Sequence, residues 1–583
     1  MVGAAILSAS TLLVKLLGLL FSIPLANFIS AEGMSYFYGA YDIFTIFLML
    51  STAGLPIAVS RMVSTAYATG RRREADLVFS VAFWLFFSLG LLGCLVMLFG
   101  SKQIAQLQGK PGAANTIVAL APTAFFIAVM SSLRGYFQGR SNMVPTAVSQ
   151  VIEAVSKVAI GVGLAAYIIR QYDSDAWAAV GAIVGVSISA ALGAVYLVGY
   201  KIHQRRKDRA LPQEEQPLTP RRELLLSLVR FAVPITLGAC FLSVLDFVDS
   251  AVLMDRMKTV AGFTQDQADW YSGVLGHARK FFDLPGAFVI PISTSLLPVL
   301  SGAIAAGDKR SVERTASISM RMTLLISIPA SVGMSIFAGP VCQLLLFNRP
   351  EVAQGAARLL QVLALAIAFN STLYTTNAIL QSFGRTTRPV VDMAVGGVLK
   401  IVISFFLTGI PEINVMGSAV STVVSYFVIM LLNISAVRKS LPRMDRLMAM
   451  AGPVLLASAL MGGASWAVYQ GLILVLPERV AVLPAIAAAV AVYTVCVVLF
   501  RAVSYEEVVM LPKGEAIARL LRMQKPKPEE RRAEAGQSTL PVRTEQTNPA
   551  AQSVRRDRSR GPRHMAEGRI SWTRSTKARH MKR

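Results

Sequence analysis

Long runs of apolar residues, separated by short polar stretches, occupy most of the chain. A helix that crosses a bilayer needs about 20 mostly apolar residues, because the hydrocarbon core is about 30 Å thick. The runs are continuous and do not alternate between apolar and polar positions, as the strands of a membrane barrel would. The sequence therefore predicts an all-α integral membrane protein with about fourteen transmembrane helices, at residues 3–29, 36–64, 77–100, 114–138, 143–170, 178–202, 223–252, 273–304, 316–346, 354–383, 389–410, 414–437, 446–472 and 479–502.

Basic residues are concentrated in alternate loops between these segments. The loops that follow even-numbered segments are rich in Lys and Arg, as in 71–76, 201–209, 308–314 and 438–446. The intervening loops at 171–177 and 411–414 carry few cations. Because an excess of Lys and Arg marks the cytoplasmic side of a membrane, we expect a multi-pass protein of the cell membrane with both termini in the cytoplasm.

Sequence patterns recur between the two halves of the chain. The stretch 131–158 contains a Gln, a Gly/Arg turn, a Pro and, about three helical turns later, a Lys, and 380–402 repeats this order. The segments 55–75 and 297–313 both begin with Leu-Pro and end in a basic loop. These matches predict two related halves in parallel orientation. The expected division is an N-terminal bundle at 1–202, a cytoplasmic linker at 203–222, a C-terminal bundle at 223–437, two further helices at 438–504 and a basic, mostly disordered tail at 505–583.

Composition narrows the function classes. Of the 583 residues, 54% are hydrophobic and only 15% are charged, whereas a soluble domain has about 25% charged residues. The net charge of +24 is explained first by cytoplasmic loops facing membrane lipids, so no nucleic-acid partner is expected. The four cysteines and four histidines show no ligand spacing, and no phosphate-binding loop is present. We therefore expect no metal, no cofactor and no enzymatic activity.

Charged residues inside apolar segments are costly in a membrane, so each is a candidate functional residue. The basic candidates for substrate binding are Lys15, Arg61, Arg134, Lys157, Arg279, Lys280 and Lys400. The acidic candidates for ion coupling are Asp42, Asp246, Asp249 and Asp392. The excess of cations favours an anionic substrate, while the acids keep open a cationic one.

Helical spacing and proline positions refine this set. The pairs Glu153/Lys157 and Arg279/Asp283 are four residues apart and are expected to neutralise each other within one helix. This makes Arg134 the better contact for substrate in its stretch, and Lys15 the strongest candidate overall. Proline removes a backbone donor and bends a helix, so a bent, gating eighth helix is expected from Pro285, Pro291 and Pro298.

Three stretches carry a family resemblance. KLLGLLFSIPLANFISAEGMSYFYGAYDIF (15–44), LSTAGLPIAVSRMVS (50–64) and SSLRGYFQGRSNMVPTAVSQVIE (131–153) resemble the polysaccharide-exporter branch of the multidrug/oligosaccharidyl-lipid/polysaccharide superfamily. Within that branch they are most similar to the group typified by stage V sporulation protein B and to lipid II flippases. The resemblance covers about residues 1–500 and excludes the basic tail.

The resemblance implies two six-helix bundles facing each other in a V, two extra C-terminal helices and alternating access. It implies a flippase that moves an undecaprenyl-pyrophosphate-linked saccharide, with lipid II as the leading cargo, from the inner to the outer leaflet. Envelope-synthesis enzymes are then possible partners. Two rivals stay open: a cation-coupled multidrug exporter of the same superfamily, and a membrane scaffold for envelope or spore-coat assembly that works through its tail.

Overall fold

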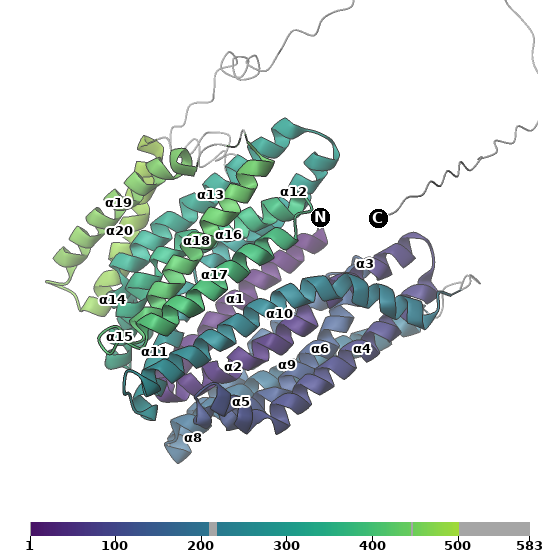
Figure 1. Cartoon of the computed structure of the whole chain (residues 1–583), viewed down its shortest axis with the longest axis horizontal. Helices are drawn as coiled ribbons and strands as arrows, with labels where there is room; N and C mark the ends of the chain where they lie inside the picture. The colour runs from purple at the N-terminus through teal and green to yellow at the C-terminus, as the bar shows by residue number, and fades with distance from the viewer. Residues whose placement is uncertain (1, 209–217, 443, 445–446, 501–583) are drawn as a thin grey trace, which may run out of the picture. The chain divides into compact units, whose positions relative to one another are not determined.

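The computed structural model describes residues 2–208, 218–442, 444 and 447–500 (Figure 1). Within these ranges every regular element is a helix. The predicted all-α membrane fold class is therefore confirmed. The predicted tail, and residues 209–217 of the predicted linker, lie outside the described residues.

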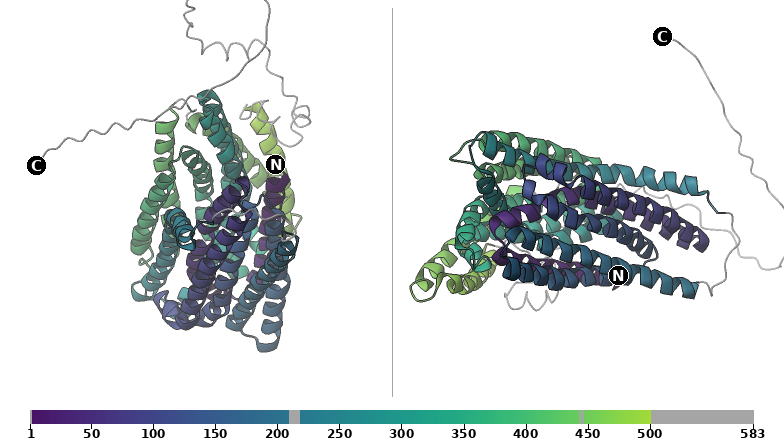
Figure 2. Two further views of the ribbon diagram at one scale, coloured as in Figure 1. Left: turned by 90° about the vertical axis from the view of Figure 1, so that its right-hand side faces the viewer. Right: turned by 90° about the horizontal axis from the view of Figure 1, so that it is seen from below.

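The first half of the chain forms helices that run side by side along a roughly common direction (Figures 1 and 2). Several predicted segments are divided into shorter helices at Gly or Pro. One example is 36–64, which breaks before Leu55 because Gly54 and Pro56 favour the start of a new helix. The elements are α1 (Val2–Phe28), α2 (Ala31–Thr52), α3 (Leu55–Ala68), α4 (Arg72–Phe99), α5 (Ser101–Leu107), the 3₁₀-helix η1 (Pro111–Ala113), α6 (Ala114–Gly139), α7 (Val144–Ser156), the π-helix η2 (Lys157–Val162), α8 (Gly163–Tyr172) and α9 (Asp175–Asp208).

The second half contains more broken segments. The predicted eighth helix is divided by a turn at residues 283–285, and the predicted tenth is bent by 52° at Ala364. The elements are α10 (Arg221–Thr259), α11 (Gln265–Phe282), α12 (Gly286–Ala305), α13 (Lys309–Ile336), α14 (Ala338–Leu345), α15 (Pro350–Leu363), α16 (Leu365–Ser382), α17 (Thr387–Leu407), α18 (Met416–Ser440), α19 (Leu447–Leu472) and α20 (Glu478–Leu499).

The predicted count of fourteen spans is not confirmed. By length and apolarity, 12 of the described helices are able to cross a membrane, or 13 when the bent pair α15–α16 is taken as one span. The first predicted segment falls on α1, a helix of 27 residues in which the stretch Leu13–Phe28 is apolar. Of the other predicted segments, 143–170 falls on three observed helices, α7, η2 and α8, and the rest each fall on one or two.

Most buried apolar side chains form separate clusters in the two halves, although Ala26 and Ala31 of the first half join a cluster of the second. The largest contains residues between Phe21 and Ala232, and two others lie between Ala26 and Val454. Helix α10 contributes to both sides: its first part supplies Leu228 to the first-half cluster, and its last part supplies Met254 to a second-half cluster. Helix α10 therefore joins the halves through packing as well as through the chain, and Figure 1 shows it between them.

The π-helix η2 interrupts the predicted fifth span at Lys157. A π-turn widens the helical spacing, and such turns are frequent at functional sites. The turn packs tightly on α9, because a Cβ atom on Gly185 would collide with the backbone of Gly161. This close approach brings η2, whose first residue is Lys157, directly against α9.

Candidate functional site

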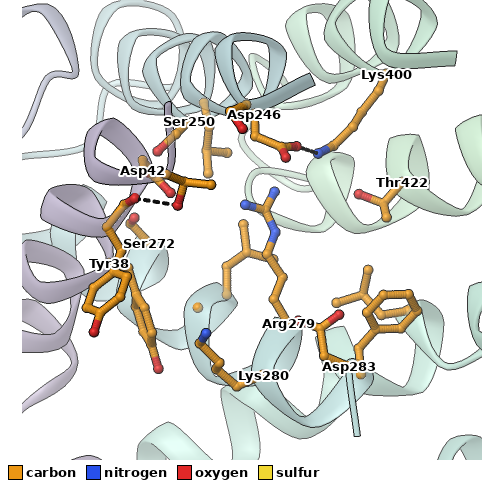
Figure 3. Close-up of a pocket in the computed structure, with 18 of the residues that line it drawn as sticks. Tyr38, Asp42, Asp246, Ser250, Ser272, Arg279, Lys280, Asp283, Lys400 and Thr422 are labelled. Atoms are coloured by element: carbon orange, nitrogen blue, oxygen red, sulfur yellow. Dashed lines mark hydrogen bonds and ion pairs between the residues drawn. The ribbon is translucent and has the colours of Figure 1, made fainter. Parts of the chain in front are cut away.

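A cavity of about 350 Å³ lies between the two halves (Figure 3). Helix α2 lines it from the first half, and α10, α11, α17 and α18 from the second. The wall contains hydroxyl and aromatic side chains and an unusual number of charges. The charged lining residues are Asp42, Lys110, Asp246, Arg279, Lys280, Asp283 and Lys400.

The break between α11 and α12 places three of these charges. Arg279 and Lys280 stand in the last turn of α11, and Asp283 caps that helix. Pro285 then occupies the N-cap position of α12, so the chain cannot continue as one regular helix. Discontinuous helices of this kind commonly form substrate sites in transporters. Figure 3 shows these side chains opposite Asp42 and Ser250.

Asp249 binds two of the cations from behind the cavity wall. Its Oδ2 lies 3.0 Å from Arg279 Nη2 and 3.1 Å from Lys400 Nζ, and its side chain is fully buried. Lys400 also lies 3.4 Å from Asp246 Oδ1, the contact drawn as a dashed line in Figure 3. The expected local pair of Arg279 with Asp283 is wrong, because Arg279 instead reaches across to α10.

Lys280 is held differently from its neighbours. It is exposed and lines the cavity, yet among the described residues it makes no salt bridge. Its charge interacts at longer range with Asp283 and with Lys157. Asp283 in turn interacts with Lys15 on α1, which is half-buried and stands outside the lining. The positive charge of Lys280 in the cavity is thus only weakly compensated by nearby acidic side chains.

Lys157 faces aromatic rings rather than an acid. Its Nζ donates to the Tyr41 hydroxyl at 3.2 Å and lies 4.5 Å from the centre of the Phe21 ring. The expected pairing of Glu153 with Lys157 is wrong: Glu153 accepts a hydrogen bond from Arg134 at 3.1 Å. The four-residue spacing itself is intact, because the Lys157 N–H still donates to the Glu153 carbonyl. The two side chains instead find partners on other helices, Arg134 on α6 and Tyr41 on α2. Since Tyr41 lines the cavity, Lys157 lies just behind its wall.

Three predicted site residues stand away from the cavity. Arg134 is occupied by Glu153 and Ser149, Asp392 by Arg388 on its own helix, and Arg61 lies over the Phe231 ring at 4.9 Å. The cavity lining, as far as the chain is described, includes none of the three. Pro291 and Pro298 lie inside α12, and Pro285 is its N-cap. Their gating role stays a prediction.

Lys110 is a site residue that the sequence patterns did not reveal. It lies in the short polar loop before η1, where a charged residue ordinarily faces water. In the structure Lys110 is 1% exposed, lines the cavity and donates to Ser250 Oγ at 3.2 Å. The local sequence Gln108-Gly109-Lys110-Pro111 carries no periodic signal, so only tertiary packing identifies this residue.

The chain is similar to known membrane proteins over most of its length. The profile of the family described as "Polysaccharide biosynthesis protein" matches residues 1–304, and that of the MatE family matches 273–406. Stage V sporulation protein B of Bacillus subtilis is 25% identical over 517 residues, which cover 88% of this chain and 97% of that protein. Lipid II flippase MurJ of Bacillus subtilis is 24% identical over 446 residues, covering 73% of this chain and 80% of the relative.

Solved structures share the fold. The inward closed conformation of a lipid II flippase MurJ matches with a TM-score of 0.65 at 15% identity, over 86% of this chain and 99% of that one. An inward-facing multidrug resistance transporter of the MATE family and MOP superfamily matches with a TM-score of 0.61 at 14% identity, over 74% and 94%. The arrangement of helices is therefore the MATE-like fold that the sequence resemblance implied.

Proposed function

The chain belongs to the polysaccharide biosynthesis protein family, and on this premise we propose that it is a flippase for an undecaprenyl-pyrophosphate-linked saccharide. The leading cargo is lipid II, which one of the similar proteins is named for. The predicted direction is from the inner to the outer leaflet of the cell membrane. The MATE-like fold supports alternating access, in which two halves move about a central site.

The observation that carries this proposal is Lys280, an exposed cation in the cavity with no salt-bridge partner among the described residues. Lys157 and Lys15 lie close enough to interact with the charges at this corner. Arg279 and Lys400 are already bound to Asp249, so Lys280 is the better point of attachment for a new anion. An ammonium group binds phosphate oxygens as a point charge and needs no fixed orientation.

In the proposed cycle the pyrophosphate group enters the cavity and is held mainly by Lys280, with Lys157 and Lys15 nearby. The polyprenyl chain stays in lipid, because its transfer out of the hydrocarbon would be unfavourable. The halves then rock about the headgroup, and α10, which packs against both, is the expected pivot. The membrane potential acts on this step, since moving one charge through 100 mV changes the free energy by about 2.3 kcal/mol.

A second candidate, export of a cationic compound, is favoured by the acids of the same cavity. Asp42, Asp246 and Asp283 line it, and a cation-coupled exporter would use such groups for its ion or its cargo. Asp246 and Asp283 each have a basic neighbour, which weakens their attraction for a new cation. The anionic cargo is therefore the better-supported of the two.

A binding titration separates the two cargo classes. The purified full-length protein is titrated with lipid II and, in parallel, with a cationic dye. We expect Lys280→Met to weaken lipid II binding roughly tenfold, the equivalent of one charge–charge contact of about 1.4 kcal/mol. Lys102→Met, at an exposed position of α5, is the matched control and should leave binding unchanged. Dye binding tighter than lipid II binding, unaffected by Lys280→Met, would contradict the proposal.

A further inference from the structure

The loop Gln108–Gly109–Lys110 of the first half is inserted into the second half. The Gly109 carbonyl oxygen accepts hydrogen bonds from Lys258 Nζ and Gln265 Nε2, both at 3.0 Å. The Lys110 ammonium donates to Ser250 Oγ at 3.2 Å. All three partners belong to α10 or α11. We call this set of contacts between the loop and α10–α11 the latch.

The backbone of the loop is shaped for this contact. Gly109 has a φ of +72°, in the left-handed region that favours glycine. A Cβ atom at this position would lie 2.9 Å from the Met254 Cβ, which is closer than side chains tolerate. Glycine therefore allows both the turn and the close approach to α10.

The positive charge of Lys110 is compensated by one carboxylate from each half. Its charge interacts with Asp42 of α2 and with Asp269 of α11. Asp269 is fully buried and accepts hydrogen bonds from Gln265 at 3.0 Å and from Tyr36 at 3.3 Å. A buried charge that loses its partner is strongly destabilised. Separation of α2 from α11 would therefore require a new partner for Lys110.

The latch lies near a second set of contacts between the halves. Asn27 at the end of α1 donates to the Leu345 carbonyl at 2.7 Å and accepts from the Asn348 N–H at 2.9 Å. Helix α2 begins a few residues later and carries Tyr36, which contacts Asp269. The Asn27–Asn348 contact thus reports whether the halves are joined at this end.

Lys110 belongs to the latch and also lines the cavity. We propose that Lys110 couples cargo binding in the cavity to the stability of the latch. An anionic group of the cargo draws the Lys110 ammonium away from Ser250 and Asp269, and the latch weakens. This inference rests on the proposed transport of an anionic headgroup. A ligand shifts a conformational equilibrium only through a difference in affinity for the two states. Here the difference arises because Lys110 can bind the cargo fully only when it leaves the latch.

Cross-linking tests the coupling in the full-length protein. Asn27→Cys and Asn348→Cys are introduced after replacement of Cys94, Cys240, Cys342 and Cys496, and the pair is treated with a short thiol cross-linker. The probe is undecaprenyl pyrophosphate, with uncharged undecaprenol as control. We expect the probe, but not undecaprenol, to reduce the cross-linking yield about fivefold, and Lys110→Met to remove this response.

Three further variants keep the test decisive. Lys258→Met removes a hydrogen bond of the same loop, but Lys258 is absent from the described cavity lining, so the response to the probe should persist. Ser250→Ala keeps the Lys110 charge and should lower the yield without probe while preserving the response. Lys110→Arg should restore part of the response that Lys110→Met lost.

Probe binding is measured in the same samples by thermophoresis. An equal response of wild type and Lys110→Met overturns the coupling and leaves the proposed function standing. Probe binding without any change in cross-linking in the wild-type background also overturns it. If the probe binds no variant, the proposed anionic cargo itself is wrong, and the coupling is overturned with it.

Discussion

The two copies of the repeated stretch, 131–158 and 380–402, share a backbone plan. Each has a helix, a turn containing a residue with positive φ, and a second helix that starts near a proline. The turn residue is Ser141 with φ 58° in the first copy and Gly384 with φ 73° in the second. The prolines are Pro145 near the start of α7 and Pro389 near the start of α17. The repeat thus preserves the chain path.

The copies differ in what their matching lysines contact. Lys157 lies against the Tyr41 hydroxyl and the Phe21 ring, at the start of a π-helix. Lys400 stands in a regular helix and binds Asp246 and Asp249 of α10. The same position therefore carries a weakly compensated cation in one half and a neutralised one in the other. We propose from this difference that the first copy contributes to cargo binding, while Lys400 of the second copy connects α17 to α10 through its salt bridges.

The largest effect on stability is expected from Lys400→Met. The substitution leaves Asp249 with Arg279 alone and Asp246 without a salt bridge among the described residues. Loss of a buried ionic partner should lower the free energy of unfolding by about 3 kcal/mol, measured by thermal unfolding in detergent. Lys439→Met, at an exposed position of α18, is the control. A stability equal to wild type would show that α17 is not held by this pair.

Gly185→Ala should have the second largest effect on stability, lowering the free energy of unfolding by about 2 kcal/mol through overpacking. The added methyl group would collide with Gly161 and push the π-helix away from α9. Gly163→Ala is the matched control, because nothing lies within 4 Å of a Cβ at that position. Thermal unfolding of both variants measures the difference. Equal stability of the two would argue that the tight packing behind Lys157 is unimportant.

Arg134→Met should have a smaller effect, about 1 kcal/mol, because its salt bridge with Glu153 is partly exposed. The pair joins α6 to α7 within the first copy. A double-mutant cycle with Glu153→Gln isolates the interaction from the separate effects of each change. A coupling energy of zero would contradict a structural role for this pair and return Arg134 to the candidates for cargo binding.

Lys157→Met should change stability least, by less than about 1 kcal/mol, since it loses one hydrogen bond and a cation–π contact. Binding of undecaprenyl pyrophosphate should nevertheless weaken roughly tenfold. Titration and thermal unfolding of the same sample measure both quantities. If Lys400→Met, compared at equal folded fraction, weakened binding as much as Lys157→Met, the functional difference between the copies would be wrong.

Sequence patterns predicted the helical membrane fold because long apolar runs have one stable solution in a bilayer. They also predicted Arg279, Lys280, Lys400, Asp42 and Asp246, which the cavity brings together, because a charge within an apolar run is conspicuous. The partner of each charge was not predictable. Arg279 lies four residues from Asp283, yet it binds Asp249 on another helix, and only helix packing decides between them.

Lys110 and the π-helix are two further features that local sequence patterns could not predict, because both involve contacts between distant parts of the chain. Lys110 follows a short helix in a polar loop, and nothing local indicates that the loop is buried between the halves. The π-helix packs on α9 through the contact of Gly161 with Gly185, two residues on different helices that no local pattern brings together. The breaks within spans were also not predictable from the sequence, because an apolar run continues without interruption through a bend such as the one at Ala364.

The most direct test of the account is the rate at which the full-length protein, reconstituted in vesicles, moves lipid II from one leaflet to the other. We predict flipping by wild type, and slower flipping by Lys280→Met and Lys157→Met in proportion to their weaker binding. Lys102→Met should flip at the wild-type rate. Vesicles that flip lipid II no faster than protein-free vesicles, or a Lys280→Met rate equal to wild type, would contradict the central claim that this cavity carries an anionic headgroup.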